Sequence, residues 1–517
     1  MERARQGRKA AVASDSGLIV SSHPIATEAG AMQLRDGGTA CDAVLAAAIT
    51  QTVVEPQMTS IAGMMKLVYH DASAGETWWL SAGHRAPGVP LRLDAESVLG
   101  GRGVAVPGWW AGFEAASRRF GTKSRRTLMT TAIELAREGV EVYPQLYGVM
   151  YKEAEQLGGS AAGREIFYDA GETLLVPGRL IRNRRAAETL ERLAEEGSDH
   201  FYRGEFARGL CEFLGRREGV LSMADLESYE AVWSKAVTGT YRDYEIATSG
   251  VPDGGINIIE ALNMVELLDL ADLAAPAESE ELCFELMLIA QDVLERGAEQ
   301  RDPGAAPDGT GTLISKEYAT ARHALLKMAG PRVGVESPHV GTDHLTAADQ
   351  FGNVAVLMHT CTADPWINGL FHEGIAIPAS AGWTTRTPTP PGARITIDGA
   401  ENIAFRDGKP VLASGSPSGS LLPCVLQNMV NILDFGMTIE ESVKRPRFGF
   451  TGVGSCRLAI ESGMPEELTA GLERRGMQLK RIGPYDEYMG SYDAISWEDG
   501  RLVACPDPRR TGAAATG

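Results

Sequence analysis

The sequence predicts a mixed α/β (α+β) fold in which helices and strands form a single intertwined body. Helical and strand-like hydrophobic patterns alternate along all 517 residues, without a repeat of fixed period. Hydrophobic residues make up 44% and charged residues 23% of the chain, which is typical of a packed protein and excludes disorder of the whole chain. A length of about 150 residues per domain would suggest three domains, but no change in composition marks a boundary.

The first predicted elements are two helices within residues 26–54, which Asp36-Gly37-Gly38 separates. The glycine pair is suited to ending the first helix, because glycine readily adopts the left-handed backbone of a helix C-terminus. The second helix contains the run Ala43–Ile49, which is apolar on all sides and should therefore be buried. Amphipathic spacing predicts further helices at residues 127–138, 185–196 and 257–270.

Short apolar runs bounded by turn residues predict the strands. The clearest pair comprises residues 344–348 and 354–358, which the turn residues Asp349–Asn353 join. The last residues, 505–517, are rich in Pro, Gly and Ala, and we expect this tail to be disordered. Other strands are predicted at Lys66–His70, Glu373–Ile377 and Pro410–Ala413.

Charge and cysteine content exclude several classes of protein. With 49 basic and 68 acidic residues, the net charge is −19, which disfavours nonspecific binding to nucleic acid or to an anionic membrane. No apolar run reaches the ~18 residues of a membrane span, and the basic N-terminus lacks the apolar core of a secretory signal. The seven cysteines include no C-x-x-C pair, so we expect no disulfide framework. These features predict a soluble cytoplasmic protein with reduced thiols.

The commonest cofactor and metal motifs are absent from the sequence. The chain has no G-x-x-x-x-G-K-[ST], no H-E-x-x-H and no G-x-G-x-x-G, and its nine histidines show no ligand spacing. The segment Gly415–Gly419 is similar to a nucleophile elbow, but Pro417 occupies the central position where that motif requires serine. We therefore predict no metal and no organic cofactor.

Eight ordered blocks of sequence carry a resemblance to a known family. They are residues 21–56, 104–122, 201–210, 219–231, 241–255, 341–357, 407–420 and 445–450. Through these blocks the chain resembles the γ-glutamyltransferase family, whose members are N-terminal-nucleophile (Ntn) hydrolases. The resemblance implies a four-layer αββα sandwich. It also implies self-cleavage into a large fragment, 1–341, and a small fragment, 342–517, which stay together as a heterodimer and can assemble further into a homo-oligomer.

The resemblance implies that Thr342 is the nucleophile and that the chain is cut between Gly341 and Thr342. A threonine hydroxyl is a poor nucleophile until a base removes its proton, and an N-terminal threonine carries such a base in its own α-amine. The α-amine has a reference pKa of about 7.7–8, so a substantial fraction is neutral near physiological pH. Because an internal threonine lacks this amine, cleavage must precede catalysis.

Further catalytic residues are implied by the same resemblance. Thr360 matches the family threonine that hydrogen-bonds the nucleophile and orients it. Ser418 and Gly419 match a family Gly-Gly pair whose backbone N–H groups form the oxyanion hole. Because these donors are main-chain groups, serine at position 418 can still contribute its N–H to the oxyanion hole. Its side chain, however, lies beside the reacting centre.

The residues that bind the substrate in typical members of the family differ in this sequence. An arginine that grips the α-carboxylate of a γ-glutamyl substrate is replaced by Gly83. The two residues that follow, His84 and Arg85, are the nearby side chains that can offer polar contacts to a substrate instead.

Three other substrate positions of the family are also changed. A family aspartate that binds the α-amine of the substrate aligns with Trp383, whose aromatic face could stack on a ring or an apolar acyl group. A Ser-Ser pair that also holds the carboxylate aligns with Ile397-Asp398, and so Asp398 puts a negative charge where an anion would bind. A family asparagine two residues beyond the orienting threonine becomes Thr362.

These departures predict a small-molecule substrate other than an ordinary γ-glutamyl compound, since a zwitterionic head requires both a cation and an anion. Our specific hypothesis is hydrolysis of a C–C bond beside a carbonyl, as in a divergent branch of the family that acts in the biosynthesis of alkylproline antibiotics. The alternatives are an amidohydrolase acting on a non-glutamyl amide and an ordinary γ-glutamyltransferase. A non-catalytic binding subunit is a further alternative, against which the retention of Thr342, Thr360 and Gly419 argues.

Overall fold

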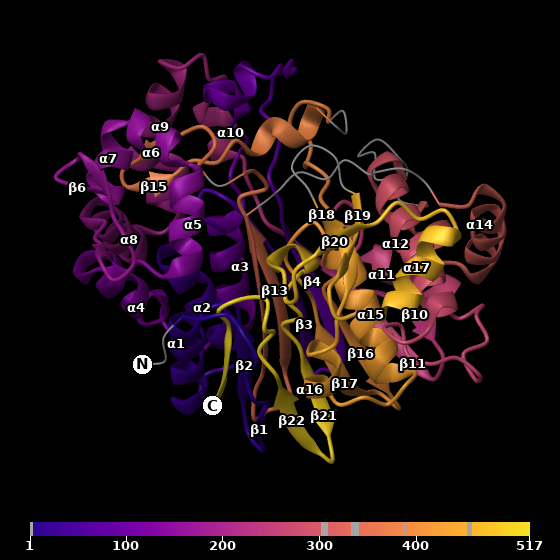
Figure 1. The fold of residues 1–517 in the computed structure, drawn as a ribbon. Coiled ribbons are helices and arrows are strands. Elements are labelled where there is room, and N and C mark those ends of the chain that lie inside the picture. The colour runs from indigo at the N-terminus through magenta and orange to yellow at the C-terminus, as the bar shows by residue number, and fades with distance from the viewer. Residues whose placement is uncertain (1–3, 301–308, 332–340, 365, 386–388, 452–456) are drawn as a thin grey trace.

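Two seven-stranded sheets packed face to face, with helices on both outer faces, form the body of the molecule (Figure 1). The structure is a computed structural model that describes residues 4–300, 309–331, 341–364, 366–385, 389–451 and 457–517. The four layers of helix, sheet, sheet and helix confirm the fold class expected from the sequence.

The first sheet contains the strand that begins with Thr342. All neighbouring strands in this sheet are antiparallel, and Thr342 pairs directly with Thr360. Because side chains alternate along a strand, Thr342, His344 and Thr346 face the second sheet, whereas Leu345 packs among the helices. In spatial order the strands are β23 (Ala513–Thr516), β2 (Leu18–Ser21), β12 (Thr342–Ala348), β13 (Val354–Thr360), β3 (Met64–Asp71), β4 (Glu76–Ala82) and β9 (Val232–Lys235).

The second sheet is also antiparallel, and it covers the face of the first sheet on which Thr342 lies. Apolar side chains from both sheets, among them Val68, Val356, Ile403 and Ile495, fill the layer between them. The strand order is β1 (Val12–Ser14), β22 (Arg501–Ala504), β21 (Ile495–Glu498), β17 (Lys409–Ser414), β16 (Asn402–Arg406), β11 (Tyr244–Thr248) and β10 (Val237–Tyr241).

Helices from the N-terminal half cover the outer face of the first sheet, on the left of Figure 1. The run Ala43–Ile49 lies at most 1% exposed, as its all-round hydrophobicity predicts. The helices of this layer are α1 (Pro24–Arg35), α2 (Ala40–Val54), α3 (Trp109–Phe120), α4 (Arg125–Glu138), α8 (Arg184–Glu196) and α9 (Glu205–Gly215).

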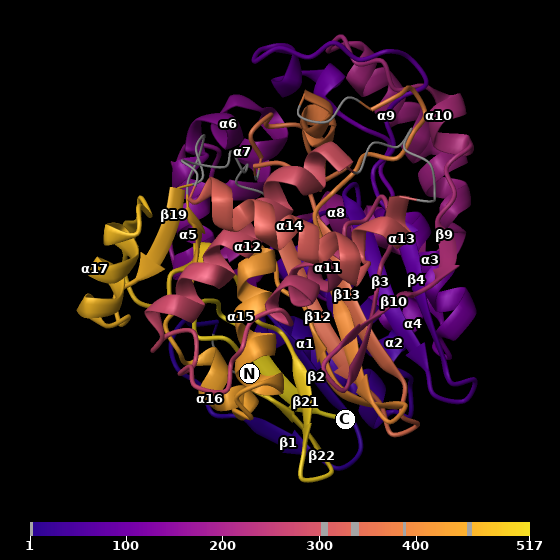
Figure 2. The ribbon, with the colours of Figure 1, turned by 90° about the vertical axis from the view of Figure 1, so that its right-hand side faces the viewer.

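The outer face of the second sheet is covered by a helical layer drawn from both halves of the chain, which faces the viewer in Figure 2. Because this layer mixes residues on both sides of Thr342, the two halves share one core. Its helices are α11 (Ile256–Val265), α12 (Glu280–Gln300), α14 (Lys316–Ala329), α15 (Leu421–Leu433), α16 (Ile439–Val443) and α17 (Glu466–Arg474).

Shorter elements complete the fold around the sandwich. The shortest of them come in pairs, such as β14 (Phe371–His372) with β15 (Ile375–Ala376). The others are α5 (Pro144–Lys152), α6 (Ala154–Gly159), α7 (Ala161–Phe167), α10 (Met223–Glu227), α13 (Gly309–Leu313), β5 (Val140–Glu141), β6 (Tyr168–Asp169), β7 (Thr173–Leu174), β8 (Leu180–Ile181), β18 (Phe448–Thr451), β19 (Arg457–Glu461) and β20 (Lys480–Ile482).

Most of the predicted elements are present, and two are shorter than expected. The helix pair within 26–54, the helices at 127–138 and 185–196 and the hairpin of 344–348 with 354–358 are confirmed. The helix predicted over 257–270 ends at Val265. The strand predicted at Glu373–Ile377 forms only at Ile375–Ala376.

The prediction of a disordered tail at residues 505–517 is wrong. Ala513–Thr516 form β23, whose backbone pairs with β2 at the edge of the first sheet. Arg509 is fully buried and forms ion pairs with Glu461 and Asp507. The reason for the error is physical: a strand of small residues gains its stability from the neighbouring strand's hydrogen bonds, which leave no hydrophobic pattern in the sequence.

The lengths of the helices and the state of the cysteines relate to the predicted cellular environment of the protein. Within the described ranges, every helix is too short or too polar to cross a lipid bilayer. The six cysteines that the structure describes are all free, and Cys456 lies outside the described residues.

Candidate active site

Thr342 and Thr360 face each other at the ends of β12 and β13. The hydroxyl of Thr342 donates a hydrogen bond to Oγ of Thr360 over 2.9 Å. Thr342 is 3% exposed and Thr360 is fully buried, so bulk water does not compete for this hydrogen bond. The structure therefore brings together the two residues that the sequence predicted as nucleophile and orienting group.

The carbonyl of Gly341 receives two hydrogen bonds beside the Thr342 hydroxyl. The Thr360 hydroxyl donates to it, and the backbone N–H of Cys361 donates over 3.2 Å. Such a pair of donors is the arrangement that stabilises negative charge on a carbonyl oxygen under attack. Glycine is required here, because a Cβ at position 341 would lie 2.7 Å from the carbonyl oxygens of Gln57 and Met58.

The backbone at Thr362 orients Thr360 from the other side. Thr362 has a φ of +52°, which is strained for a β-branched residue. In this conformation its N–H donates to Oγ of Thr360 over 2.9 Å, leaving the Thr360 proton for the carbonyl of Gly341. The indole of Trp383 donates to the carbonyl oxygen of Thr362 over 2.6 Å. Trp383 and Thr362, both predicted as substrate contacts, are therefore tied to each other and to the orienting threonine.

The loop after β17 passes over β12, the strand that begins with Thr342. Position 415 must be glycine, because a Cβ there would lie 2.0 Å from Nε2 of His344. Ser418 has a φ of +87°, a backbone conformation that favours glycine. Within the described residues, the N–H groups of Ser418 and Gly419 form no hydrogen bond, so both donors are available. The strain at Ser418 is of the kind stored at functional sites.

A buried charged network holds the backbone of Thr342, the predicted nucleophile. Arg510 donates to the carbonyl oxygen of Thr342 over 2.8 Å and to the carboxylate of Asp343 over 3.1 Å. The Ser22 hydroxyl lies 2.8 Å from Glu55 and 3.0 Å from Asp343. Burial, followed by the charge of Glu55, raises the pKa of Asp343 well above its usual range, and Arg510 opposes this shift.

Sequence reasoning missed Arg510 because it lies in the segment expected to be disordered. Replacing Arg510 by Met should slow cleavage at Gly341–Thr342 at least tenfold, because the carbonyl of Thr342 loses its donor and Asp343 loses its cation. Removing one partner of a buried ion pair also costs roughly 3–5 kcal/mol of stability. A time course on denaturing gels and a thermal melt measure the two effects.

Arg501→Met is the matched control for this substitution, because Arg501 forms an exposed ion pair with Asp15. It should leave both cleavage and melting temperature unchanged. Normal cleavage by the Arg510→Met protein would show that the network does not position the nucleophile.

The predicted substrate residues His84 and Arg85 lie in different surroundings. The imidazole of His84 is buried, and burial lowers its pKa to about 4, against the effect of the backbone at Val106 and Cys361. The ring lies beside the backbone of these two residues, and within the described residues it forms no hydrogen bond of normal length and angle. Arg85 donates to the backbone of Asp225 and to Ser228, so its guanidinium is held by the α10 segment.

The segment around Asp398 meets Gly83 and β3 in one corner of the molecule. The backbone oxygen of Asp398 accepts a hydrogen bond from Nζ of Lys66 over 2.9 Å. The N–H of Ile397 donates to the carbonyl oxygen of Pro252 over 3.3 Å. The positions predicted to replace the family's carboxylate-binding residues are therefore neighbours in space.

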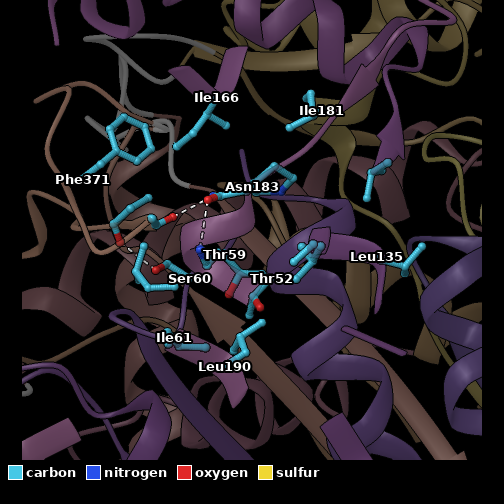
Figure 3. A pocket seen from close by; sticks show the side chains of 18 of the residues that line it. Thr52, Thr59, Ser60, Ile61, Leu135, Ile166, Ile181, Asn183, Leu190 and Phe371 are labelled. Atoms are coloured by element: carbon cyan, nitrogen blue, oxygen red, sulfur yellow. Dashed lines mark hydrogen bonds between the residues drawn. The ribbon is translucent and has the colours of Figure 1, made fainter. Parts of the chain in front are cut away.

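A separate apolar cavity of about 50 Å³ lies on the helix side of the first sheet (Figure 3). The side chains of Leu135, Ile166 and Phe371 line it, and the hydroxyls of Thr59 and Ser60 lie at its edge. None of the predicted site residues lines this cavity. Within the ranges that the structure describes, His, Cys, Asp and Glu side chains nowhere gather in a group of three that could hold a metal ion.

Comparison with known proteins identifies the family. The family model described as Gamma-glutamyltranspeptidase matches residues 26–371 and 387–517. The chain is 30% identical to the Acylase ACY 1 proenzyme of Pseudomonas sp. (strain SE83) and 29% identical to the Glutathione hydrolase proenzyme of Bacillus subtilis (strain 168). Both alignments cover 96% of this chain and 91% of the relative. The crystal structure of cephalosporin acylase from Bacillus halodurans superposes with a TM-score of 0.84 at 22% identity, covering 100% of this chain and 98% of that one.

The match extends over nearly the whole chain, and it includes both halves that meet at Thr342. Members of this family are Ntn hydrolases and acyl transferases, and the geometry around Thr342 and Thr360 suits that chemistry. The chain therefore belongs to the gamma-glutamyltranspeptidase family and is an enzyme of the Ntn-hydrolase type.

Proposed function

We propose that the chain cleaves itself between Gly341 and Thr342 and then acts as an acyl hydrolase with Thr342 as nucleophile. In the first step Oγ of Thr342 attacks the carbonyl carbon of Gly341. Its proton passes to Oγ of Thr360, which delivers its own proton to the carbonyl oxygen. The C–N bond then breaks, the nitrogen takes a proton to become the α-amine of Thr342, and water hydrolyses the remaining ester. The short chain of hydrogen bonds from Thr342 through Thr360 to Gly341 supports this route.

The same groups serve the proposed reaction on a substrate. The α-amine takes the proton of the Thr342 hydroxyl as Oγ attacks the substrate carbonyl. The N–H groups of Ser418 and Gly419 stabilise the oxyanion. The leaving group departs with the proton from the α-amine, and water releases the acyl group from its ester with Thr342. Residues 1–341 and 342–517 remain together because they share one core.

We propose that the acyl group is not an ordinary γ-glutamyl group. The observation that carries this proposal is the corner around Gly83, where the side chain of a carboxylate-binding arginine is missing. Arg85 does not replace it, because its guanidinium is held by Asp225 and Ser228. Mass spectrometry tests the mechanism: incubation with an acyl p-nitroanilide should add the mass of the acyl group to the 342–517 fragment alone. Addition to residues 1–341 would contradict it.

The bond cleaved in the natural substrate is the finer part of the proposal. The specific candidate is hydrolysis of a C–C bond beside a carbonyl in an alkylproline-type antibiotic precursor, where a stabilised carbanion leaves and takes the proton from the α-amine. The alternative is hydrolysis of a non-glutamyl amide, which the similarity to a protein named as an acylase favours. A β-diketone and an amide with the same acyl part distinguish the two, since the first candidate expects faster cleavage of the diketone.

Trp383 should bind the acyl part of the substrate. Replacing Trp383 by Ala is expected to lower kcat/KM about tenfold for a cyclic or apolar acyl group, because an aromatic contact is lost. Self-cleavage should continue, because Thr342 and Thr360 keep their hydrogen bond. Trp383→Phe keeps the aromatic face but loses the hydrogen bond to Thr362. This variant therefore separates binding of the acyl group from support of the backbone at Thr362. Loss of self-cleavage in Trp383→Ala would show a structural role instead.

A further inference from the structure

The helix-facing side of β12 and β13 carries buried polar side chains directly behind Thr342 and Thr360. Asp343 and His359 pair with each other across these two strands, one position along from the two threonines. Because side chains alternate along a strand, Asp343 and His359 lie on the opposite face of the sheet from Thr342 and Thr360. Both side chains are fully buried, so bulk water does not compete for their hydrogen bonds.

The hydrogen bonds of His359 fix which of its ring nitrogens carries the proton. The indole of Trp109 donates to Nδ1 of His359 over 3.0 Å, and the hydroxyl of Thr59 lies 2.9 Å from the same nitrogen. An indole N–H can only donate, so Nδ1 is an acceptor and the proton of the neutral ring lies on Nε2. Burial, followed by an effect of His344, lowers the pKa of His359 to about 3, so the ring is neutral at physiological pH.

The proton on Nε2 of His359 sets the orientation of the next side chain, Gln51. Nε2 donates to Oε1 of Gln51 over 2.9 Å, so the amide nitrogen of Gln51 points away from the ring. This nitrogen donates to Oγ of Ser22 over 2.8 Å and to the carboxylate of Glu55 over 3.0 Å. With the opposite tautomer of His359, the amide would turn and bring its carbonyl oxygen against Glu55. Because both oxygens only accept hydrogen bonds, a favourable contact would become a repulsive one.

The chain of hydrogen bonds ends at the strand of Thr342. Ser22 accepts from Gln51, so its own proton remains for the carboxylate of Glu55 or of Asp343, which lie 2.8 and 3.0 Å from its oxygen. Asp343 follows Thr342 in the chain and shares one guanidinium with the carbonyl oxygen of Thr342. A change of tautomer at the imidazole is therefore transmitted by hydrogen bonds to the backbone of Thr342.

We infer that His359, in its Nε2-protonated form, is a positioning residue for the attack of Thr342 on the carbonyl of Gly341. It acts through Gln51, whose amide holds the carboxylate of Glu55 behind the strand. The inference rests on the proposed function, because it assumes that Thr342 is the nucleophile of self-cleavage. His359 lies on the far face of the sheet from the reacting atoms, so it affects their position and takes no part in proton transfer.

Two substitutions of His359 separate the roles of its nitrogens. In His359→Gln the amide nitrogen takes the place of Nε2 and can still donate to Gln51, so self-cleavage should keep at least about a third of its rate. In His359→Asn the amide takes the place of Nδ1 and does not reach Gln51, so self-cleavage should slow at least about tenfold. Gln51→Met removes the amide itself and should slow self-cleavage at least as much. Denaturing-gel time courses of freshly synthesised protein measure these rates.

The matched control is His70→Asn. His70 is a buried histidine at the other end of the sheet, where it pairs with Val354 and its Nδ1 lies 3.1 Å from the hydroxyl of Thr77. This variant should cleave at the unaltered rate. Melting temperatures, measured for every variant, separate position from stability: a purely structural role for His359 would lower the rate in His359→Gln and His359→Asn equally, in proportion to the loss of stability.

Nitrogen-15 NMR tests the tautomer in the unaltered protein. In protein labelled at its nine histidines, the imidazole signals that are absent from His359→Gln should belong to a neutral ring protonated on Nε2. A proton on Nδ1, self-cleavage of His359→Asn or Gln51→Met at the unaltered rate, or equal slowing in the two His359 variants would overturn the inference. An unaltered chain that is never cut before Thr342 would contradict the proposed function instead.

Discussion

Replacing Thr342 by Ala is expected to leave the chain as a single polypeptide without activity, whereas the unaltered protein should separate on a denaturing gel into residues 1–341 and 342–517. The physical reason is that the attack on the carbonyl of Gly341 requires the Thr342 hydroxyl, which already lies in hydrogen-bond contact with Thr360. Loss of a nucleophile that acts with its partners as a unit lowers turnover by at least about 10⁴-fold. N-terminal sequencing of the smaller fragment should begin at Thr342.

Two variants make this experiment specific. Thr346→Ala removes a buried hydroxyl on the same face of the same strand, where it donates to the backbone of Asp493, and should still cleave. Thr342→Ser retains a hydroxyl and should cleave more slowly. The two fragments should co-purify without a disulfide, since they share the cores on both sides of the sheets. A fragment that began at another residue, or cleavage by Thr342→Ala, would exclude Thr342 as the nucleophile.

Ordinary γ-glutamyl donors are expected to be turned over two to three orders of magnitude less efficiently than the preferred acyl donor. The α-carboxylate of a γ-glutamyl group would find no arginine side chain extending from position 83, where typical members of the family carry one. A missing charge-assisted partner is worth roughly 3–5 kcal/mol. Remote contacts also position the acyl carbon for attack, so kcat should fall together with affinity.

Steady-state kinetics with γ-glutamyl-p-nitroanilide, and with glutathione in the presence of a dipeptide acceptor, measure this effect. The 4-aminobutyryl anilide is the matched control, because it is the γ-glutamyl compound without its α-carboxylate, and it should react faster. Efficient γ-glutamyl transfer from glutathione to the dipeptide would contradict the prediction and would assign the ordinary reaction of the family.

Much of the fold could be predicted because its signals are local. The helix pair within 26–54 and the hairpin of 344–348 with 354–358 carry their periodicity and turn residues in the sequence itself. Thr342 and Thr360 could be predicted by resemblance, since the blocks around them lie in order along the chain. Their direct pairing across β12 and β13 then follows from the register of that hairpin.

Other parts of the site could not be predicted, because they depend on contacts between distant segments. Arg510 reaches the carbonyl of Thr342 only because β23 pairs with β2 and holds the tail against the sheet. Asp253 lies 170 residues from Gly83 in the chain, and only the packing of the two sheets brings them into contact. Nothing in the sequence near Asp253 marks its carboxylate as fully buried.

The sequence by itself determined the family and the layered α/β architecture, and it predicted Thr342 as the nucleophile, because hydrophobic periodicity and ordered motifs are properties of neighbouring residues. The tertiary structure decided the surroundings of the predicted substrate residues. It directs Arg85 toward α10, ties Trp383 to Thr362 and buries the carboxylate of Asp253 beside Gly83. The physical reason is that the effect of a charge depends on burial and on its partners in space, and both are set only when the two sheets pack together.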